Sequence, residues 1–206
     1  MGRGRAPGYD DQREKILAQA AHLFAQRGYP ATSMNQVAEG SGLSKPALYH
    51  YYRDKYALLL GIADNHVSRL QALVEDVSGR KLPPEAQMRE LIRRTLEEYA
   101  DAQDDHRVLT EGVKFLEPAD RERVLSKERE LVSRYARVVG AIRPELTEAE
   151  LTKPVTMLLF GMINWMFTWM RPGGGLDYEA MAPIVADLFL GGLGAVKLPQ
   201  AATESK

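Results

Sequence analysis

Apolar residues recur three and four positions apart along most of the chain, and no stretch shows the sustained alternation typical of a β-strand. This pattern predicts an all-α protein. About nine helices are expected, over residues 11–27, 33–40, 44–52, 55–78, 85–102, 106–116, 118–142, 154–170 and 177–193. We find no internal repeat in the sequence.

The expected helix ends carry residues suited to stopping or capping a helix. Gly28 follows the first helix and Gly42 lies in the turn after the second, where a glycine adopts a positive φ without a Cβ clash. Ser44 and Asp54 precede the third and fourth helices as N-caps. Pro144 is expected to end the helix over 118–142, so the next helix is expected only from Pro154.

Two short helices joined by a glycine-containing turn form the unit that places its second helix in the major groove of DNA. Here residues 33–40 are expected as the positioning helix, 41–43 as the turn and 44–52 as the recognition helix. Apolar side chains at Val37 and Leu43 would hold the two helices against Phe24 and Leu48. The sequence therefore predicts a helix-turn-helix among the first sixty or so residues.

The same region resembles a known family. It carries the runs Ile16–Phe24, Gly28-Tyr29, Thr32-Ser33, Val37-Ala38, Gly42–Tyr52 and Asp54-Lys55. Together these runs look like the N-terminal domain of the TetR family of transcriptional repressors, over about residues 12–60. The chain departs from the family pattern at Gly40, where a better helix former is usual, and at Tyr56, where an acidic residue is commoner. The resemblance implies a three-helix DNA-binding unit fused to a helical domain for ligand binding and dimerisation.

On this resemblance, nine residues are expected at the DNA: Thr32, Ser33, Ser44, Lys45, Pro46, Ala47, Tyr49, His50 and Lys55. Thr32 and Ser33 would offer a hydroxyl and helix N-terminal amides to a phosphate. Tyr49 and Lys55 would hold the backbone of the opposite strand. Lys45 and His50, with Pro46 and Ala47 beside them, would approach base edges and carry the sequence information. Because Tyr49 and Tyr51 cannot share a helix face, we expect Tyr51 to be packed and Tyr49 exposed.

The predicted domains are a DNA-binding domain over 11–56 and a ligand-binding and dimerisation domain over 57–198. Residues 1–10 are interpreted as a flexible basic arm, which would either enter the minor groove or have no role. Residues 199–206 are interpreted as a disordered tail. Residues 1–55 hold eight basic and five acidic side chains, although the whole chain has a net charge of −1. This asymmetry permits a DNA-facing N-terminal unit on a more acidic body.

The segments 154–170 and 177–193 are the best candidates for a dimer interface, because they are rich in large apolar residues and glycine. Their glycines offer places for close helix approach: Gly161, Gly191, Gly192 and Gly194. The TetR resemblance implies that the last two helices of each subunit form a four-helix interface. Two recognition helices would then read inverted half-sites about one helical turn apart, roughly 34–36 Å. A homodimer on a palindromic operator in double-stranded DNA is therefore expected.

A small-molecule effector is expected to bind among the helices over 85–102, 106–116, 120–142 and 154–170. The candidate lining is Arg93, Tyr99, Phe115, Leu116, Tyr135, Phe160, Asn164 and Trp165. Asn164 is polar within an apolar run, and a hydrogen bond across the dimer interface explains it equally well.

The identity of the effector rests on resemblance alone. The segment from Phe160 to the final helix is similar to regulators of fatty-acid and aromatic-acid degradation, which implies an acyl-coenzyme A thioester. The run from Gly4 to Leu60 is similar to repressors of phenylacetate catabolism, which implies phenylacetyl-coenzyme A. The cations available for its phosphates are Arg89, Arg93, Arg94, Arg107 and Lys114.

Composition excludes several classes. The absence of cysteine excludes disulfides, thiolate zinc sites and a cysteine nucleophile. No uncharged apolar run reaches the roughly 18 residues of a membrane span, and no signal peptide is recognised. We therefore expect a cytoplasmic protein with no membrane partner.

An enzyme is the first rival to a DNA-binding regulator. The chain has no G-x-S-x-G elbow, no P-loop and no dinucleotide motif after a strand. His106 beside Asp104 and Asp105 is a weak metal site, because adjacent side chains in one loop rarely converge. We expect no catalytic residue, metal or cofactor. A helical adaptor that binds no DNA, a transcriptional activator, and a TetR-type regulator of another class of hydrophobic effector are also compatible with the sequence.

Overall fold

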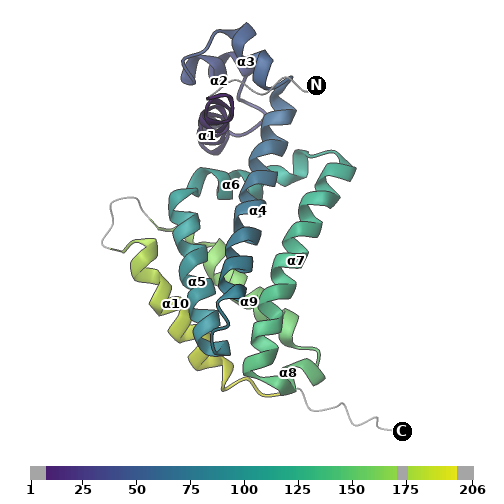
Figure 1. Cartoon of the computed structure of the whole chain (residues 1–206), viewed down its shortest axis with the longest axis vertical. Coiled ribbons are helices and arrows are strands. Elements are labelled where there is room, and N and C mark those ends of the chain that lie inside the picture. The colour runs from purple at the N-terminus through teal and green to yellow at the C-terminus, as the bar shows by residue number, and fades with distance from the viewer. Residues whose placement is uncertain (1–7, 171–175, 199–206) are drawn as a thin grey trace. The chain divides into compact units, whose positions relative to one another are not determined.

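The computed structural model describes residues 8–170 and 176–198, and within them the fold is all-α, as the apolar pattern predicts (Figure 1). The helices are α1 (Tyr9–Arg27), α2 (Met34–Gly40), α3 (Lys45–Tyr51), α4 (Lys55–Gly79), α5 (Pro84–Asp101), α6 (Gln103–Gly112), α7 (Pro118–Ile142), α8 (Pro144–Glu148), α9 (Thr152–Asn164) and α10 (Tyr178–Leu193). Short 3-10 turns follow α6 and α9, at Val113–Phe115 and Met166–Thr168. In these ranges, no helix has both the length and the hydrophobicity that a membrane crossing requires.

The described part of the chain thus holds ten α-helices rather than about nine, because α8 is not predicted by the apolar pattern. Pro144 is the first residue of α8, where the missing N–H of a proline costs nothing, so it starts a helix as well as ending one. The helix expected over 154–170 divides into α9 and the turn at Met166–Thr168.

The two predicted chain ends fall largely outside the described residues. The C-terminal tail over 199–206 and the arginines of the basic arm, Arg3 and Arg5, lie outside the described residues. The arm is nevertheless shorter than the predicted 1–10, because α1 begins at Tyr9.

The helices form two compact units, each with its own hydrophobic core. Unit 1 comprises residues 1–69 and 102–127, and unit 2 comprises residues 70–101 and 128–206. Both α4 and α7 contribute to each unit. This division differs from a domain boundary at residue 56, because α6 and the first turns of α7 share the core of the N-terminal helices.

In unit 1, α1 packs on α2 and α6, and α2 packs on α3. The core joins side chains from both stretches of the chain: Ile16, Phe24, Val37, Leu48, Leu58, Val108, Leu109, Leu116 and Val124. Gly112 allows close packing of α6, because a Cβ there would lie 3.0 Å from Cδ1 of Leu59. The Tyr56 hydroxyl donates to Oδ2 of Asp120 at 2.8 Å and accepts from the N–H of Glu117 at 3.0 Å. Tyr56 is one of the two positions where the chain departs from the family pattern. Its hydroxyl therefore joins the start of α4 to the start of α7.

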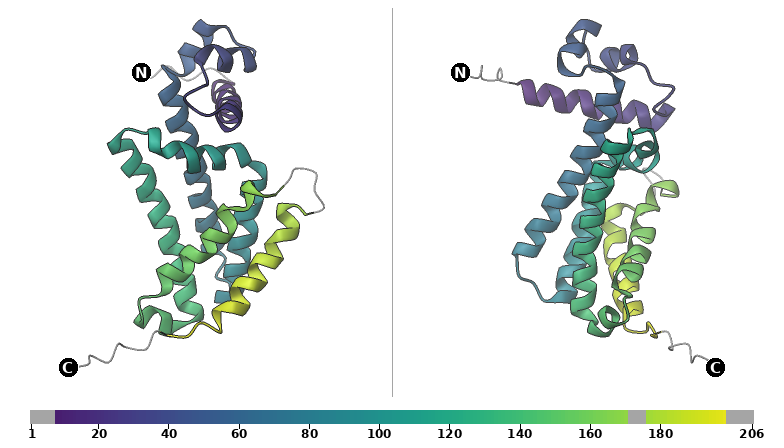
Figure 2. Two further views of the ribbon diagram at one scale, coloured as in Figure 1. Left: turned by 180° about the vertical axis from the view of Figure 1, so that it is seen from behind. Right: turned by 90° about the vertical axis from the view of Figure 1, so that its right-hand side faces the viewer.

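In unit 2, α5 packs along α10, and α9 lies beside α10 (Figure 1). Seen from the side, α9 and α10 form the face of this unit that lies away from α4 (Figure 2). The core is built on the buried ring of Tyr135, whose hydroxyl lies 2.5 Å from Oγ1 of Thr95. Arg143, just after α7, donates to the carbonyl oxygens of Leu193 and Val196 and so stabilises the C-terminal end of α10.

Candidate nucleic-acid interface

Serine side chains begin both helices of the predicted helix-turn-helix. Oγ of Ser33 accepts from the N–H of Gln36 at 3.3 Å, and the side chain of Gln36 accepts from the N–H of Ser33 at 2.8 Å. This capping box satisfies donors at the start of α2. Oγ of Ser44 accepts from the N–H of Ala47 at 3.3 Å, with Pro46 in the first turn of α3. Both short helices therefore begin where the sequence predicts.

Gly42 makes the turn between α2 and α3 with a φ of 67°, which confirms its predicted positive φ. The N–H of Gly42 donates to the carbonyl of Glu39 at 3.0 Å, and the N–H of Leu43 donates to the carbonyl of Ala38 at 2.9 Å. These two backbone hydrogen bonds close the C-terminal end of α2 and hold the turn against it.

The inner sides of α2 and α3 are buried in the core of unit 1. Val37 and Leu48 are completely buried and share this core with Phe24, while Leu43 is partly buried against it. This packing is the one that the sequence predicts. It holds α3 from behind and leaves its other side exposed.

Tyr52, directly after α3, is a supporting residue that the sequence pattern alone did not single out. It is buried, its hydroxyl accepts from Nε of Arg13 at 3.3 Å and donates to the Arg13 carbonyl at 3.4 Å, and the guanidinium lies 5.0 Å from the ring centroid. Burial raises the pKa of the Tyr52 hydroxyl. Its position four residues after the buried Leu48 is the signal that places it on the inner side.

Tyr51 and Tyr49 divide as predicted. The ring of Tyr51 stacks on that of Tyr9, with centroids 4.9 Å apart and an interplanar angle of 28°. Tyr49 lies on the other side of α3 and is 43% exposed. The stacking ties the first turn of α1 to the last turn of α3, and the sequence does not reveal it because Tyr9 falls within the predicted arm.

The outer side of α3 presents a small group of polar side chains. Lys45, Pro46, Tyr49 and His50 are exposed, and Ala47 is partly exposed. Within the described residues, Lys45 takes part in no ion pair. The group combines a cation, a phenol and an imidazole beside two small residues, which is a surface that can approach base edges and phosphates.

Thr32 does not have the role that the resemblance implied. Its side chain is buried, and its hydroxyl donates to the carbonyl oxygens of Gly28 at 3.0 Å and Leu23 at 3.3 Å. The hydroxyl therefore closes the end of α1 and is not directed to a phosphate. Ser33, the next residue, is partly committed as well, because its Oγ forms the cap of α2.

Lys55 is also engaged by contacts inside the protein. Its ammonium donates to the carbonyl oxygens of Tyr29 at 2.8 Å, Pro30 at 3.1 Å and Thr32 at 2.8 Å. It lies 4.5 Å from the ring centroid of Tyr29. An ammonium has three N–H donors, and all three are used here. Burial lowers the pKa of Lys55, and the side chain acts as a clamp on the loop that leads into α2.

The residues predicted to line an effector pocket are distributed over both units. Phe115 and Leu116 belong to unit 1, and the other six belong to unit 2: Arg93, Tyr99, Tyr135, Phe160, Asn164 and Trp165. Phe115 packs its ring against Tyr29, with centroids 5.3 Å apart. These two residues therefore belong to a different unit from the other six.

Within unit 2, four of the predicted residues meet and two do not. The hydroxyl of buried Tyr99 donates to Oδ1 of Asn164 at 2.8 Å, and the rings of Tyr135 and Phe160 are 5.0 Å apart. Asn164 thus finds a partner inside its own subunit. Trp165 is 63% exposed. Arg93 is ion-paired on the surface of α5 with Glu90 and Glu97, which neutralises the charge offered to a ligand.

The three adjacent residues considered for a metal site contact different partners. Asp104 pairs with His22 at 2.9 Å, Asp105 pairs with Arg69 at 2.7 Å, and Nδ1 of His106 lies 3.4 Å from Nε2 of His66. No group of three or more potential metal ligands occurs in the described part of the chain. The buried His66 is held neutral, because burial and the neighbouring His106 lower its pKa to about 3.

Large apolar side chains are exposed along α9 and the 3-10 turn that follows it, and on α10. They are Met157, Leu158, Met162, Trp165 and Trp169 in the first stretch, and Ile184 and Leu188 on α10. Leu158 and Leu188 are 70% and 65% exposed. The spacing of three and four residues from Leu158 to Trp169 places these side chains on one side of α9 and the turn after it. We call this set the apolar face of unit 2.

Two short capped helices at a glycine turn, packed from behind and polar in front, define a helix-turn-helix DNA-binding protein. The chain matches the family model "Bacterial regulatory proteins, tetR family" over residues 16–62 and the model "Tetracyclin repressor-like, C-terminal domain" over residues 81–193. It belongs to the TetR family of transcriptional regulators.

Two solved structures share this fold, and a named repressor is similar in sequence over most of the chain. A TetR-family regulator from Bordetella parapertussis 12822 is 32% identical, with a TM-score of 0.82 over 90% of this chain and 97% of that chain. The repressor KstR2 of Rhodococcus jostii is 23% identical over 90% of this chain and 93% of its own length. AibR, in a crystal structure with isovaleryl coenzyme A and operator DNA, is 20% identical with a TM-score of 0.71 over 92% of this chain and 100% of that chain.

Some relatives match over a shorter region. The chain spans about a third of the length of YerO of Bacillus subtilis (34%) and of the activator FasR of Mycolicibacterium smegmatis (31%), at identities of 28% and 37%.

Proposed function

We propose that this TetR-family regulator is a repressor that binds a palindromic operator as a homodimer. We further propose that a small effector, an acyl-coenzyme A thioester such as phenylacetyl-coenzyme A, releases it. The proposed DNA binding rests on the outer side of α3, where Lys45, Tyr49 and His50 are exposed. The inner side of the same helix is packed into the core of unit 1.

In this proposal α3 lies in the major groove. Lys45 and His50 reach base edges, with Pro46 and Ala47 allowing the helix to approach closely. Tyr49 and the N-terminal ends of α2 and α3, at Ser33 and Ser44, hold phosphates and so set the register. Thr32 and Lys55 act from inside, because they fix the loop before α2.

The apolar face of unit 2 supports the dimer. A row of exposed leucine, methionine and tryptophan side chains is costly in water, at about 25 cal/mol per Å² of apolar surface. At Gly161, Gly191 and Gly192 no atom of the described residues lies within 4 Å of where a Cβ would stand, so packing within that part of the subunit does not require a glycine at these positions. A second copy packed on α9 and α10 would cover the row and bring two recognition helices into one complex.

The effector part of the proposal rests on unit 2 and on the neighbours. AibR is described in complex with isovaleryl coenzyme A and operator DNA, and KstR2 is named as a repressor. In unit 2 the Tyr99–Asn164 pair supplies a buried hydrogen-bonding group among apolar side chains, which suits a thioester or amide oxygen. An effector that favours a subunit shape with the wrong half-site spacing would release the operator.

Binding of the full-length protein to a labelled duplex from upstream of its own gene tests the DNA-binding surface. We expect Lys45→Ala and Tyr49→Phe each to weaken binding by about 1–3 kcal/mol, with a smaller salt dependence for Lys45→Ala. Arg121→Ala is the matched control, because it removes an exposed cation of α7 outside the helix-turn-helix. Equal losses in all three variants, or no preference for a palindrome, would contradict the proposal.

Release of the same duplex tests the effector. Phenylacetyl-coenzyme A and isovaleryl-coenzyme A are compared with coenzyme A and phenylacetate alone. Release by a thioester but not by its separate halves supports the proposal, and release by none of them refutes the acyl-coenzyme A effector. A transcription assay with the operator in front of a reporter gene decides between repression and activation, since the partial relative FasR is named as an activator.

A further inference from the structure

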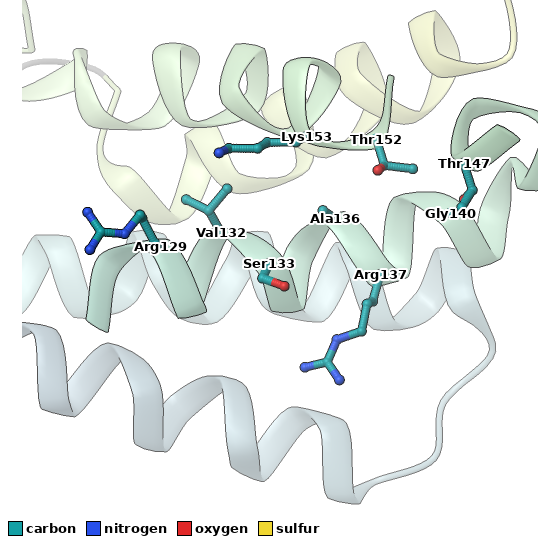
Figure 3. Close-up of a pocket in the computed structure, with 9 residues that line it drawn as sticks. All are labelled: Arg129, Val132, Ser133, Ala136, Arg137, Gly140, Thr147, Thr152 and Lys153. Atoms are coloured by element: carbon teal, nitrogen blue, oxygen red, sulfur yellow. The ribbon is translucent and has the colours of Figure 1, made fainter. Parts of the chain in front are cut away.

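Unit 2 has a groove of about 490 Å³ between α7 and the start of α9 (Figure 3). Figure 3 shows Lys153 extending over Val132, whereas Arg137 leaves α7 on the opposite side. Because these two cations diverge, they do not form one site for an anion. Side chains that do converge lie in unit 1, where the ring of Tyr9 meets two rings of α3.

Tyr9, Tyr51 and His50 form a cluster of three rings. The ring centroid of Tyr9 lies 4.9 Å from that of Tyr51 and 6.3 Å from that of His50, and the centroids of His50 and Tyr51 are 5.6 Å apart. The imidazole stands at 89° to the ring of Tyr9 and at 81° to that of Tyr51. All three separations lie in the range of about 4.5–7 Å that is favourable for aromatic pairs. Tyrosines from two helices therefore contact one imidazole.

The cluster has a partly buried base and an exposed tip. Tyr9 and Tyr51 are partly buried, and His50 is exposed. His50 follows Pro46 by four residues and Ala47 by three, so it shares with them the side of α3 that is proposed to approach the bases. Tyr9, in contrast, is the first residue of α1. It therefore contacts His50 from outside the helix-turn-helix.

These contacts restrict a side chain that would otherwise be free to move. An exposed side chain changes rotamer rapidly, and fixing it when a complex forms costs conformational entropy. Tyr51 lies in the last turn of α3, where helices tend to fray, and its stack on Tyr9 holds it in place. An imidazole that is oriented before DNA arrives loses less entropy on binding. It also directs its ring nitrogens one way, which favours one pattern of donors and acceptors on a base pair.

We propose that Tyr9 is a positioning residue for His50. Together with Tyr51 it holds the imidazole in the orientation that reads a base pair, so the start of α1 contributes to the choice of operator without touching a base. This inference rests on the proposed function, in which α3 lies in the major groove.

A second link between α1 and the end of α3 provides a matched control. The hydroxyl of Tyr52 exchanges hydrogen bonds with Arg13, one turn further along α1 than Tyr9. Tyr52→Phe removes these bonds and keeps the buried ring, so it loosens α1 from α3 without removing a ring from the cluster. A merely structural role for Tyr9 would give Tyr9→Leu and Tyr52→Phe the same effects.

The imidazole Cε1–H resonance of His50 reports the surroundings of the ring without DNA, in the full-length protein labelled with ¹³C-histidine. His50→Gln identifies this resonance among those of the four histidines. Neighbouring rings displace the resonance of a proton held beside them. At one fixed pH, Tyr9→Leu should therefore move the resonance toward its position in free histidine, and Tyr52→Phe should leave it unchanged. An unchanged resonance in Tyr9→Leu would overturn the proposal, whether or not the protein binds an operator.

Affinities for operator duplexes that each carry one changed base pair test the role in specificity. The base pair read by His50 is the one at which His50→Ala loses discrimination. There, Tyr9→Leu is expected to reduce discrimination by about two- to tenfold, the range that ordering one side chain represents. Tyr9→Phe should retain the discrimination because the ring is kept. In the His50→Ala background, Tyr9→Leu should have no further effect at this base pair.

Two results would overturn the role in specificity. One is a loss of affinity in Tyr9→Leu that is equal at every base pair, and the other is a loss that Tyr52→Phe reproduces at the base pair read by His50. Circular dichroism confirms that each variant is folded. If no operator is preferred while the His50 resonance still moves in Tyr9→Leu, the proposed function fails and the positioning of His50 stands.

Discussion

The ammonium of Lys55 lies 2.8 Å from the carbonyl oxygens of both Tyr29 and Thr32, and so joins the first turn of α4 to the loop that leads into α2. These carbonyls belong to a stretch of chain without regular structure, where the Tyr29 carbonyl has one further donor in the N–H of Thr32 at 3.4 Å. The position of α2 therefore depends on a charge that lies outside the helix-turn-helix itself.

Lys55→Met is expected to destabilise the protein by about 1–3 kcal/mol, because it removes the donor to the Thr32 carbonyl oxygen and leaves that of Tyr29 with only the N–H of Thr32 at 3.4 Å. Urea unfolding followed by circular dichroism measures this loss. The variant should also bind the operator more weakly, since the loop before α2 is released. Lys45→Met is the control, because its exposed side chain should affect DNA binding and leave stability within about 0.5 kcal/mol. If Lys55→Met were as stable as the unchanged protein, water would be satisfying the carbonyl oxygens in place of the ammonium, and the expected role of Lys55 would be wrong.

Gly42→Ala is expected to cost roughly 1–2 kcal/mol, because the turn holds this residue at a φ of 67°. No atom lies within 4 Å of the added Cβ, so the penalty comes from backbone conformation rather than from a clash. Gly79→Ala, at the end of α4, is the matched control with equal space and no positive φ. Thermal unfolding compares the two. A similar small effect of both substitutions would contradict the backbone argument.

Sequence reasoning succeeds where one local pattern decides the outcome. Ser33, Gly42 and Ser44 are examples, since a cap or a positive φ depends on a few neighbouring residues. The burial of Val37 and Leu48 likewise follows from their helical spacing. These features account for the helix-turn-helix and for the all-α fold.

The roles of Thr32 and Lys55 could not be read in the same way. Whether a hydroxyl or an ammonium points to solvent or to a carbonyl depends on how α1, α4 and the intervening loop meet in space. The pair Tyr9 and Tyr51, which are 42 positions apart, is a tertiary contact of the same kind. Phe115 is predicted beside Tyr99 for its apolar character alone, and the structure places the two in different units.

The buried His66 makes stability depend on pH. Its pKa is lowered to about 3 in the folded chain, against 6.5 ordinarily, by burial, by His106 and by the nearby Arg69, whose own partner is Asp105. Between these values the unfolded chain binds a proton that the folded chain excludes, so stability falls as the pH falls. The expected slope is about 1.4 kcal/mol per pH unit.

His66→Gln should flatten this dependence between pH 6.5 and about 3. Urea unfolding at several pH values in that window measures the slope. His22→Gln is the control, because its side chain is 49% exposed and lies on α1. A slope that is unchanged in His66→Gln would assign the acid sensitivity to other groups.

Leu158→Lys is expected to abolish dimerisation if a second copy covers the apolar face of unit 2. The side chain is 70% exposed, so the substitution should leave the fold of the subunit intact while placing a charge in the interface. Light scattering after gel filtration gives the mass. Ala72→Lys, on the exposed side of α4, is the control. A dimer that survives Leu158→Lys would place the interface elsewhere.

The shared core of unit 1 bears on the exchange of DNA-binding domains between regulators of this family. Leu58 packs in the same core as Val108 and Val124, although these lie 50 and 66 positions further along the chain. A chimaera joined near residue 56 would pair the N-terminal helices of one protein with the α6 of another and would have to repack their common core. A transplanted DNA-binding unit should fold better when it includes α6 and the start of α7 from the same protein. The unit then keeps Asp120, which accepts a hydrogen bond from Tyr56.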